Sequence, residues 1–181
     1  MIQKNKFTTY DMCLIAIFTA IISILAQIAI PLPSGVPITL QTFGIILTGL
    51  ILGAKKGAFA VLLYLLLGTV GLPVFHGFKG GLQSFIGPTG GFLLSFPIMA
   101  FFVGYGAEKK AYKYIYPIFL FLGTVLNYGC AVLVYSLVVH ISISAAIAAC
   151  VLPFIPSTIL ISILASMLGF NIKKRLGNKH F

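Results

Sequence analysis

The sequence is poor in acidic residues. Two of its 181 residues are acidic, Asp11 and Glu108, whereas twelve are Lys or Arg. Ion-coupled carriers commonly bury an acidic residue along the transport path, and acid–base enzymes often use paired carboxylates. Both acids stand at the edges of apolar runs and close to basic residues. The composition therefore disfavours a proton- or cation-coupled carrier and leaves no carboxylate pair for catalysis.

Cysteines are also few, and common catalytic motifs are absent. Cys13, Cys130 and Cys150 are far apart and form no Cys-x-x-Cys pair, which predicts packing residues rather than a metal site or a disulfide framework. The sequence has no Gly-x-x-x-x-Gly-Lys-Ser/Thr, no His-Glu-x-x-His and no Gly-x-Ser-x-Gly. We therefore predict that the chain is not an enzyme, does not hydrolyse ATP itself, and needs no metal or cofactor.

Charged residues make up 8% of the chain and hydrophobic residues 60%. Soluble domains average about 25% charged residues, and about 20 apolar residues cross a bilayer as a helix. These figures predict an all-α integral membrane protein with six transmembrane helices in a single membrane domain, residues 1–181. The spans are expected at about residues 11–30, 38–53, 58–70, 92–106, 116–139 and 146–170.

Eleven of the twelve basic residues form four clusters, at residues 4–6, 55–56, 109–113 and 173–179. Lys and Arg concentrate in cytoplasmic loops, and six spans place all four clusters and both termini on that side. Anionic lipid of the cytoplasmic leaflet suits such clusters. We therefore expect a multi-pass protein of the cell membrane with cytoplasmic N- and C-termini and no nucleic-acid partner.

The segment from Gly71 to Gly91 joins the third and fourth expected spans on the outer side. It holds seven glycines, two prolines and three phenylalanines, with Lys79 as its one cation. Irregular backbone at membrane depth is tolerated where it is buried or lines a cavity, so we expect the segment to cap a ligand pocket. Backbone N–H groups beside Gly80 and Gly81 could form an anion-binding nest with Lys79; otherwise Lys79 is a solvated loop residue. Phe78 and its neighbours either wall the pocket or pack the loop.

Two amides and one pair of small residues lie within the expected spans. Gln41 is costly in an apolar span unless it has a partner, which is either another helix or a ligand. Asn127, in the fifth span, is a second candidate ligand contact. Ala16 and Ala20 lie four residues apart on one helix face, a spacing that serves close packing either within the chain or against another membrane protein.

Four motifs resemble the BioY family, the biotin-specific substrate-binding (S) subunits of energy-coupling-factor (ECF) vitamin transporters, over nearly the whole chain. They are Pro31-Leu-Pro with Val36-Pro-Ile-Thr-Leu-Gln-Thr42, then Leu65-Leu-Leu-Gly-Thr-Val-Gly-Leu-Pro-Val-Phe75, Phe85-Ile-Gly-Pro-Thr-Gly-Gly91, and Leu152-Pro-Phe-Ile-Pro156. The resemblance implies a six-helix fold in the bacterial plasma membrane that captures the vitamin at the outer face. It also implies a transmembrane coupling protein (EcfT-type) and two ABC ATPases as partners, with Ala16 and Ala20 docking on the coupling protein.

Three positions depart from the family pattern. Lys79 stands where the family usually has Asn, and Thr158 and Ile161 replace an Asp and a Lys that help to hold biotin. Loss of an acid and a base together avoids leaving one buried charge unpaired. Biotin remains one expected ligand, and a related carboxylate with an apolar head, such as lipoate, is the alternative ligand. A stand-alone membrane carrier is a second alternative function. The residues expected to contact the ligand are Gln41, Phe78, Lys79, Gly80, Gly81, Thr89, Asn127, Thr158 and Ile161.

Overall fold

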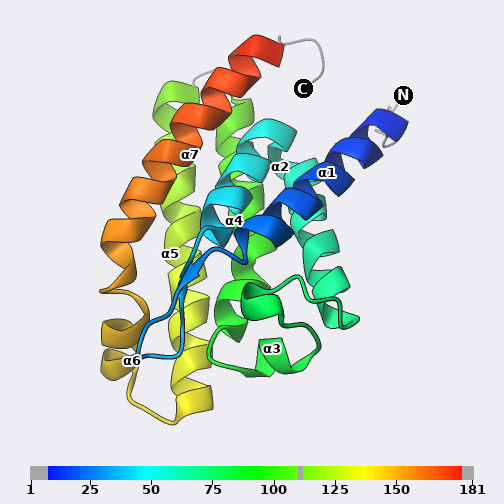
Figure 1. The fold of residues 1–181 in the computed structure, drawn as a ribbon. Helices are drawn as coiled ribbons and strands as arrows, with labels where there is room; N and C mark the ends of the chain where they lie inside the picture. Colours follow the sequence, from blue (N-terminus) through cyan, green and yellow to red (C-terminus); the bar gives the residue numbers. More distant parts are fainter. Residues whose placement is uncertain (1–7, 110–111, 177–181) are drawn as a thin grey trace, which may run out of the picture.

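The computed structural model describes residues 8–109 and 112–176 and is a bundle of antiparallel helices (Figure 1). Long apolar runs form the helices, because a helix satisfies all of its backbone hydrogen bonds internally. The elements in chain order are α1 (Thr9–Leu25), β1 (Ala29–Ile30), β2 (Ile38–Thr39), α2 (Gln41–Thr69), the 3-10 helix η1 (His76–Phe78), α3 (Gln83–Ile86), α4 (Gly90–Glu108), α5 (Tyr112–Val139), α6 (Ile143–Cys150) and α7 (Phe154–Leu176).

Helix α2 is two helical segments that meet at Gly53. Gly53 has φ 81°, in the left-handed region that favours glycine, and the two halves run up and back down in Figure 1. They correspond to the spans expected at residues 38–53 and 58–70. The loop expected at residues 53–57 is in fact a break of one residue. Glu108 explains how so tight a break is held, because its Oε1 accepts a hydrogen bond from the N–H of Ala54 at 2.8 Å.

Two of the expected spans have different limits in the structure. Helix α1 ends at Leu25 rather than near residue 30, since Ile30 pairs with Ile38 in a short antiparallel ladder before Pro31. The segment expected as one span at 146–170 is divided into α6 and α7 by a turn at residues 151–153. Pro153 interrupts the helix, whereas Pro156 is tolerated in the first turn of α7.

Four helices among the described residues are long and apolar enough to cross a membrane. They comprise residues 41–69, 90–108, 114–139 and 154–175, and α1 is a shorter apolar helix. Helix α4 is the centre of the bundle: 67% of its most apolar window is buried, against 28% in α5 and 17% in α7. Much of α5 and α7 therefore presents apolar side chains to the surroundings.

The start of α1 and the end of α7 lie at the same end of the bundle (Figure 1). We call this the basic end, because it carries Lys55, Lys56, Lys109, Lys173, Lys174 and Arg175. Helices α3 and α6 and the connecting loops lie at the opposite end, which we call the loop end. The α1 start is fixed at the basic end by a capping box and an ion pair.

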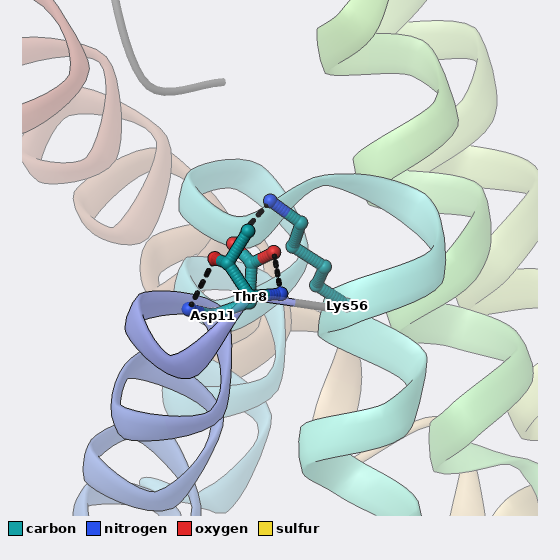
Figure 2. Close-up of polar contacts among 3 residues, drawn as sticks. All are labelled: Thr8, Asp11 and Lys56. Atoms are coloured by element: carbon teal, nitrogen blue, oxygen red, sulfur yellow. Dashed lines mark hydrogen bonds and ion pairs between the residues drawn. The ribbon is translucent and has the colours of Figure 1, made fainter. Parts of the chain in front are cut away.

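Figure 2 shows how Asp11 makes both of these contacts. The Thr8 hydroxyl accepts from the N–H of Asp11 at 3.2 Å, and the N–H of Thr8 donates to Asp11 Oδ2 at 3.0 Å. The other carboxylate oxygen, Oδ1, is 2.6 Å from Lys56 Nζ. Asp11 therefore joins the first turn of α1 to the second half of α2, just as Glu108 joins the end of α4 to the α2 break.

Candidate functional site

A cavity of about 460 Å³ lies toward the loop end of the bundle. Its walls come from the linker before α2, the segment between α2 and α4, and the helices α4, α5 and α7. The volume is in the range of small-molecule pockets, which are mostly apolar with a few placed polar groups. Neither Asp11 nor Glu108 lines it, since both are held at the basic end.

Aromatic rings form the apolar part of the wall. Phe92 and Phe96 follow each other at i, i+4 on one face of α4. The Phe92 ring packs against Tyr128 at 6.2 Å and against Phe154 at 5.8 Å between ring centroids. Phe75 enters from the segment after α2 and meets the ring of Tyr64 edge to face at 5.4 Å. These rings give a ligand an extended apolar surface with few rotatable groups.

Two buried amides line the cavity, and each uses its NH₂ group within the protein. Gln41 donates to the Tyr64 hydroxyl at 2.8 Å, and Asn127 donates to Ser95 Oγ at 2.8 Å and to the Phe92 carbonyl at 3.2 Å. Within residues 8–109 and 112–176, the side-chain carbonyl oxygen of neither amide accepts a hydrogen bond. Each amide therefore has an acceptor left for a ligand N–H group.

Lys79 and His76 are the basic residues on the cavity wall. Phe75 and Lys79 exchange backbone hydrogen bonds of 3.0 and 3.3 Å, which fixes the short turn that carries both basic residues. Burial lowers the pKa of His76, and the positive charge of Lys79 lowers it further. His76 is therefore neutral near pH 7, and Lys79 is the positive charge of a cavity without carboxylates.

Helix α7 completes the wall with Thr158 and Ile161. The hydroxyls of Thr158 and Tyr128 are 2.6 Å apart, so they form a hydrogen bond between α7 and α5. Ile161 lies one turn further along α7 and is buried. This side of the cavity thus offers neutral hydroxyls and an aliphatic side chain.

Six of the nine residues expected to contact a ligand line the cavity: Gln41, Lys79, Thr89, Asn127, Thr158 and Ile161. Phe78, Gly80 and Gly81 are not among the lining residues. Phe78 has φ 56° and a side chain that is 74% exposed, and its N–H donates to Gln27 at 2.9 Å. Gly80 sits against the backbone of Gly71 and Leu72, and the N–H of Gly81 donates to the Gly68 carbonyl at 2.7 Å. These three residues therefore shape the loop.

Other lining residues were not among those expected from the sequence. They include Thr124 and Tyr128 on α5, Phe96 on α4 and Ser157 on α7. Helical spacing in the sequence could have indicated two of these residues, because Thr124, Asn127 and Tyr128 stand at i, i+3, i+4 and so share one face of a helix. Extending the prediction from Asn127 along its helix face would have included both neighbours.

Ala16 and Ala20 lie on the exposed side of α1. The opposite side is buried and includes Ile15, Phe18 and Thr19, whose hydroxyl donates to the Ala60 carbonyl at 2.9 Å. The two alanines are therefore not used for packing within the chain. A face of small residues is left on the outside of the bundle.

Comparison with known proteins gives consistent matches. The protein-family model of the BioY family matches residues 2–178. The "Biotin transporter BioY" of Thermotoga maritima is 42% identical over 158 residues, which cover 87% of this chain and 92% of the relative. The "Probable biotin transporter BioY" of Pyrococcus horikoshii is 46% identical over 102 residues, which span 56% of this chain and 62% of that relative. A crystal structure of "the S-component for biotin from an ECF-type ABC transporter" superposes with a TM-score of 0.83 at 28% identity and 95% coverage of both chains.

The matched relatives are transporters and not enzymes, which agrees with the lack of catalytic motifs in the sequence. The long apolar helices and the family match identify a multi-pass protein of the bacterial cell membrane. The match extends over almost the whole chain, so the chain belongs to the BioY family.

Proposed function

We propose that the chain is the substrate-binding subunit of an ECF-type ABC transporter and that its ligand is biotin. The observation that carries this proposal is the cavity wall, which combines two amide carbonyl acceptors with one cation. The ureido group of biotin has two N–H donors, and its valerate chain ends in a carboxylate. Gln41 and Asn127 would accept from the ureido group, Lys79 would meet the carboxylate, and Phe92 and Phe96 would contact the apolar rings and chain.

The segment from Gly71 to Gly91 is proposed to cap the cavity at the outer face of the membrane. Phe75, His76, Lys79, Gln83 and Thr89 all belong to this segment and line the cavity. The basic end then faces the cytoplasm, in agreement with the positive-inside rule. In this arrangement α1, the two halves of α2, α4, α5 and α7 are the six transmembrane helices.

Energy for uptake would come from other subunits, because the chain has no ATP-binding motif. We propose a transmembrane coupling protein of the EcfT type and two ABC ATPases as partners. The exposed alanines at positions 16 and 20 support docking on the coupling protein, since small residues allow two helices to approach closely. A stand-alone carrier is the competing function. Biotin uptake into liposomes that contain this chain alone would support the carrier and contradict the proposal.

Lipoate is a second candidate ligand, favoured by α7. Thr158 and Ile161 replace the acid and base expected from the family, and an aliphatic wall suits the dithiolane head of lipoate better than a ureido group. Lys79 would meet the carboxylate of either vitamin. Calorimetric titration of the purified subunit with biotin and lipoate in parallel therefore tests the proposed ligand directly.

Replacing Lys79 with Ala is expected to weaken binding of both carboxylate ligands by roughly tenfold. A charge-assisted hydrogen bond contributes about 1.5–3 kcal/mol, and exposure of Lys79 to solvent favours the lower value. The measurement is the calorimetric Kd, with Lys55→Ala as the matched control because Lys55 is exposed at the basic end. Unchanged affinity of Lys79→Ala for both ligands would show that Lys79 does not bind the ligand carboxylate.

Acidification is expected to strengthen binding of the same ligands. His76 is neutral at pH 7 because its pKa lies below the usual 6.5, and it gains a positive charge as the pH falls through that lowered value. A carboxylate remains ionised down to about pH 5, so the affinity should rise by roughly twofold to fivefold as the pH falls through the lowered pKa of His76. His76→Gln should abolish this rise. An increase that persists in His76→Gln would have to come from another group.

A further inference from the structure

A second hollow lies between α5 and α7, on the half of these helices that is nearer the basic end. This groove has a volume of about 530 Å³ and is lined by residues that include Tyr116, Leu120, Ser166, Met167 and Phe170. It shares no residue with the cavity described above. It is therefore separate from the cavity in which we propose that the vitamin binds.

The groove suits an apolar occupant. The Tyr116 hydroxyl and Ser166 Oγ are 2.7 Å apart, and Ser166 also donates to the Ser162 carbonyl at 2.6 Å. The ring of Tyr116 packs edge to face on Phe170, with 4.9 Å between ring centroids. These polar groups are satisfied by each other, so the surface left to an occupant is aromatic and aliphatic.

The groove also opens directly to the lipid region. Met167, on its wall, is 61% exposed, and 17% of the most apolar window of α7 is buried. Among the described residues, helix α1 packs mainly against α2 rather than against α5 or α7. The groove would therefore stay open to lipid when a partner docks on α1.

Two cations stand at the basic end of the groove. Ile163, Met167, Phe170 and Lys174 have the spacing i, i+4, i+7, i+11, which is one face of a helix, so Lys174 lies about one turn, ~5.4 Å, beyond the groove. Arg175 follows it, and both residues are exposed. Neither is paired with a carboxylate among the described residues, since the ion pair there is Lys56–Asp11.

The neighbouring charged groups are already engaged. Lys173 donates to the Ala107 carbonyl at 3.2 Å and faces Glu108 from α4. Glu108 in turn accepts from the Ala54 N–H. Lys109 lies over the ring of Tyr105, 4.0 Å from its centroid. Among the side chains of α5 and α7 that the structure describes, Lys174 and Arg175 are thus the cations left for an external anion.

We propose that the groove binds an acyl chain of an anionic glycerophospholipid, with the headgroup phosphate on Lys174 and Arg175. Basic residues between helices at the cytoplasmic side of membrane proteins favour anionic headgroups. The apolar groove fixes where the acyl chain of the lipid lies, and the two cations select the charge of the headgroup. A single bound lipid would fill the space between α5 and α7 without entering the vitamin cavity.

Native mass spectrometry of the purified full chain, titrated with phosphatidylglycerol or phosphatidylcholine of the same acyl length, tests the proposal. We expect one phosphatidylglycerol to be retained in preference to phosphatidylcholine. Lys174→Gln and Arg175→Gln should each reduce this preference by roughly fivefold, because each removes the attraction between one surface cation and an anionic headgroup. Lys55→Gln, which removes an exposed cation elsewhere at the basic end, should leave the preference unchanged.

A second pair of variants tests the groove itself. Met167→Trp should fill the groove and reduce retention of phosphatidylglycerol, whereas Leu168→Trp places the same ring at a neighbouring exposed position that does not line it. Equal retention of both lipids, or equal effects of Met167→Trp and Leu168→Trp, would overturn the proposal. A lipid-free dimer as the main species would also overturn it, because a second copy would then cover the groove.

Discussion

Gly104→Val is expected to lower the thermal unfolding midpoint of the purified subunit by about 5–10 °C. A Cβ at position 104 would overlap the backbone of Gly53 and Ala54, and backbone cannot move aside as a side chain can. The value combines an overpacking cost of about 2–3 kcal/mol with a shift of about 2–4 °C for each kcal/mol in a chain of this size. The measurement is circular dichroism in detergent as a function of temperature.

The physical reason for so large an effect is the crossing of α2 and α4. Gly49 and Gly53 on α2 and Ala100 and Gly104 on α4 are two pairs of small residues four apart, the spacing that lets membrane helices approach closely. A Cβ at Gly49 would likewise meet the Ala100 carbonyl and Val103. Valine at position 104 must therefore push apart the two helices that form the centre of the bundle.

Gly129→Ala is the matched control. Gly129 is also a helical glycine, on α5, but a Cβ there meets no atom within 4 Å. Alanine favours a helix over glycine by about 1 kcal/mol, so this variant should unfold at the same temperature as the unmodified subunit or slightly higher. If Gly104→Val also unfolded at the same temperature as the unmodified subunit, this would contradict the close crossing of α2 and α4.

The membrane class of the protein could be read from composition, because apolar runs of sufficient length have few alternatives to helices in lipid. The residues at which the helices begin and end could not be read from composition. The charged pair at Lys55 and Lys56 indicated a loop, but the chain turns at Gly53 alone because Glu108, distant in sequence, accepts from the Ala54 N–H. Such a contact between residues 54 apart leaves no local signal in the sequence.

Part of the cavity lining was predictable, where chemistry alone marks a residue. Gln41 and Asn127 are costly within apolar helices, and both line the cavity. Glycine-rich loops are harder, because side-chain direction depends on φ and ψ at each residue. Lys79 lines the cavity whereas the adjacent Phe78, with φ 56°, does not, and no sequence pattern distinguishes the two.

The double variant Thr158→Asp with Ile161→Lys is expected to bind biotin about 10–100-fold more tightly than the unmodified subunit. Positions 158 and 161 are three residues apart on α7, so the new acid and base would share one helix face and could pair there. A carboxylate at position 158 would accept from a ureido N–H of biotin, and a hydrogen bond to a charged group contributes about 1.5–3 kcal/mol. Tyr128, whose hydroxyl is 2.6 Å from Thr158 Oγ1, could donate to the same carboxylate and fix its orientation.

The single variant Thr158→Asp separates the contribution of the acid from that of the pair. An unpaired carboxylate beside the buried Ile161 pays a desolvation cost of several kcal/mol, so this variant should bind biotin less tightly than the double variant and should also unfold at a lower temperature. Lipoate, whose dithiolane head offers no N–H donor, should gain nothing from either change. Parallel calorimetric titrations of both ligands measure these differences. A double variant that binds biotin no better than the unmodified subunit would mean that α7 does not recognise the ureido group, and that the two amides, Gln41 and Asn127, define the ligand head instead.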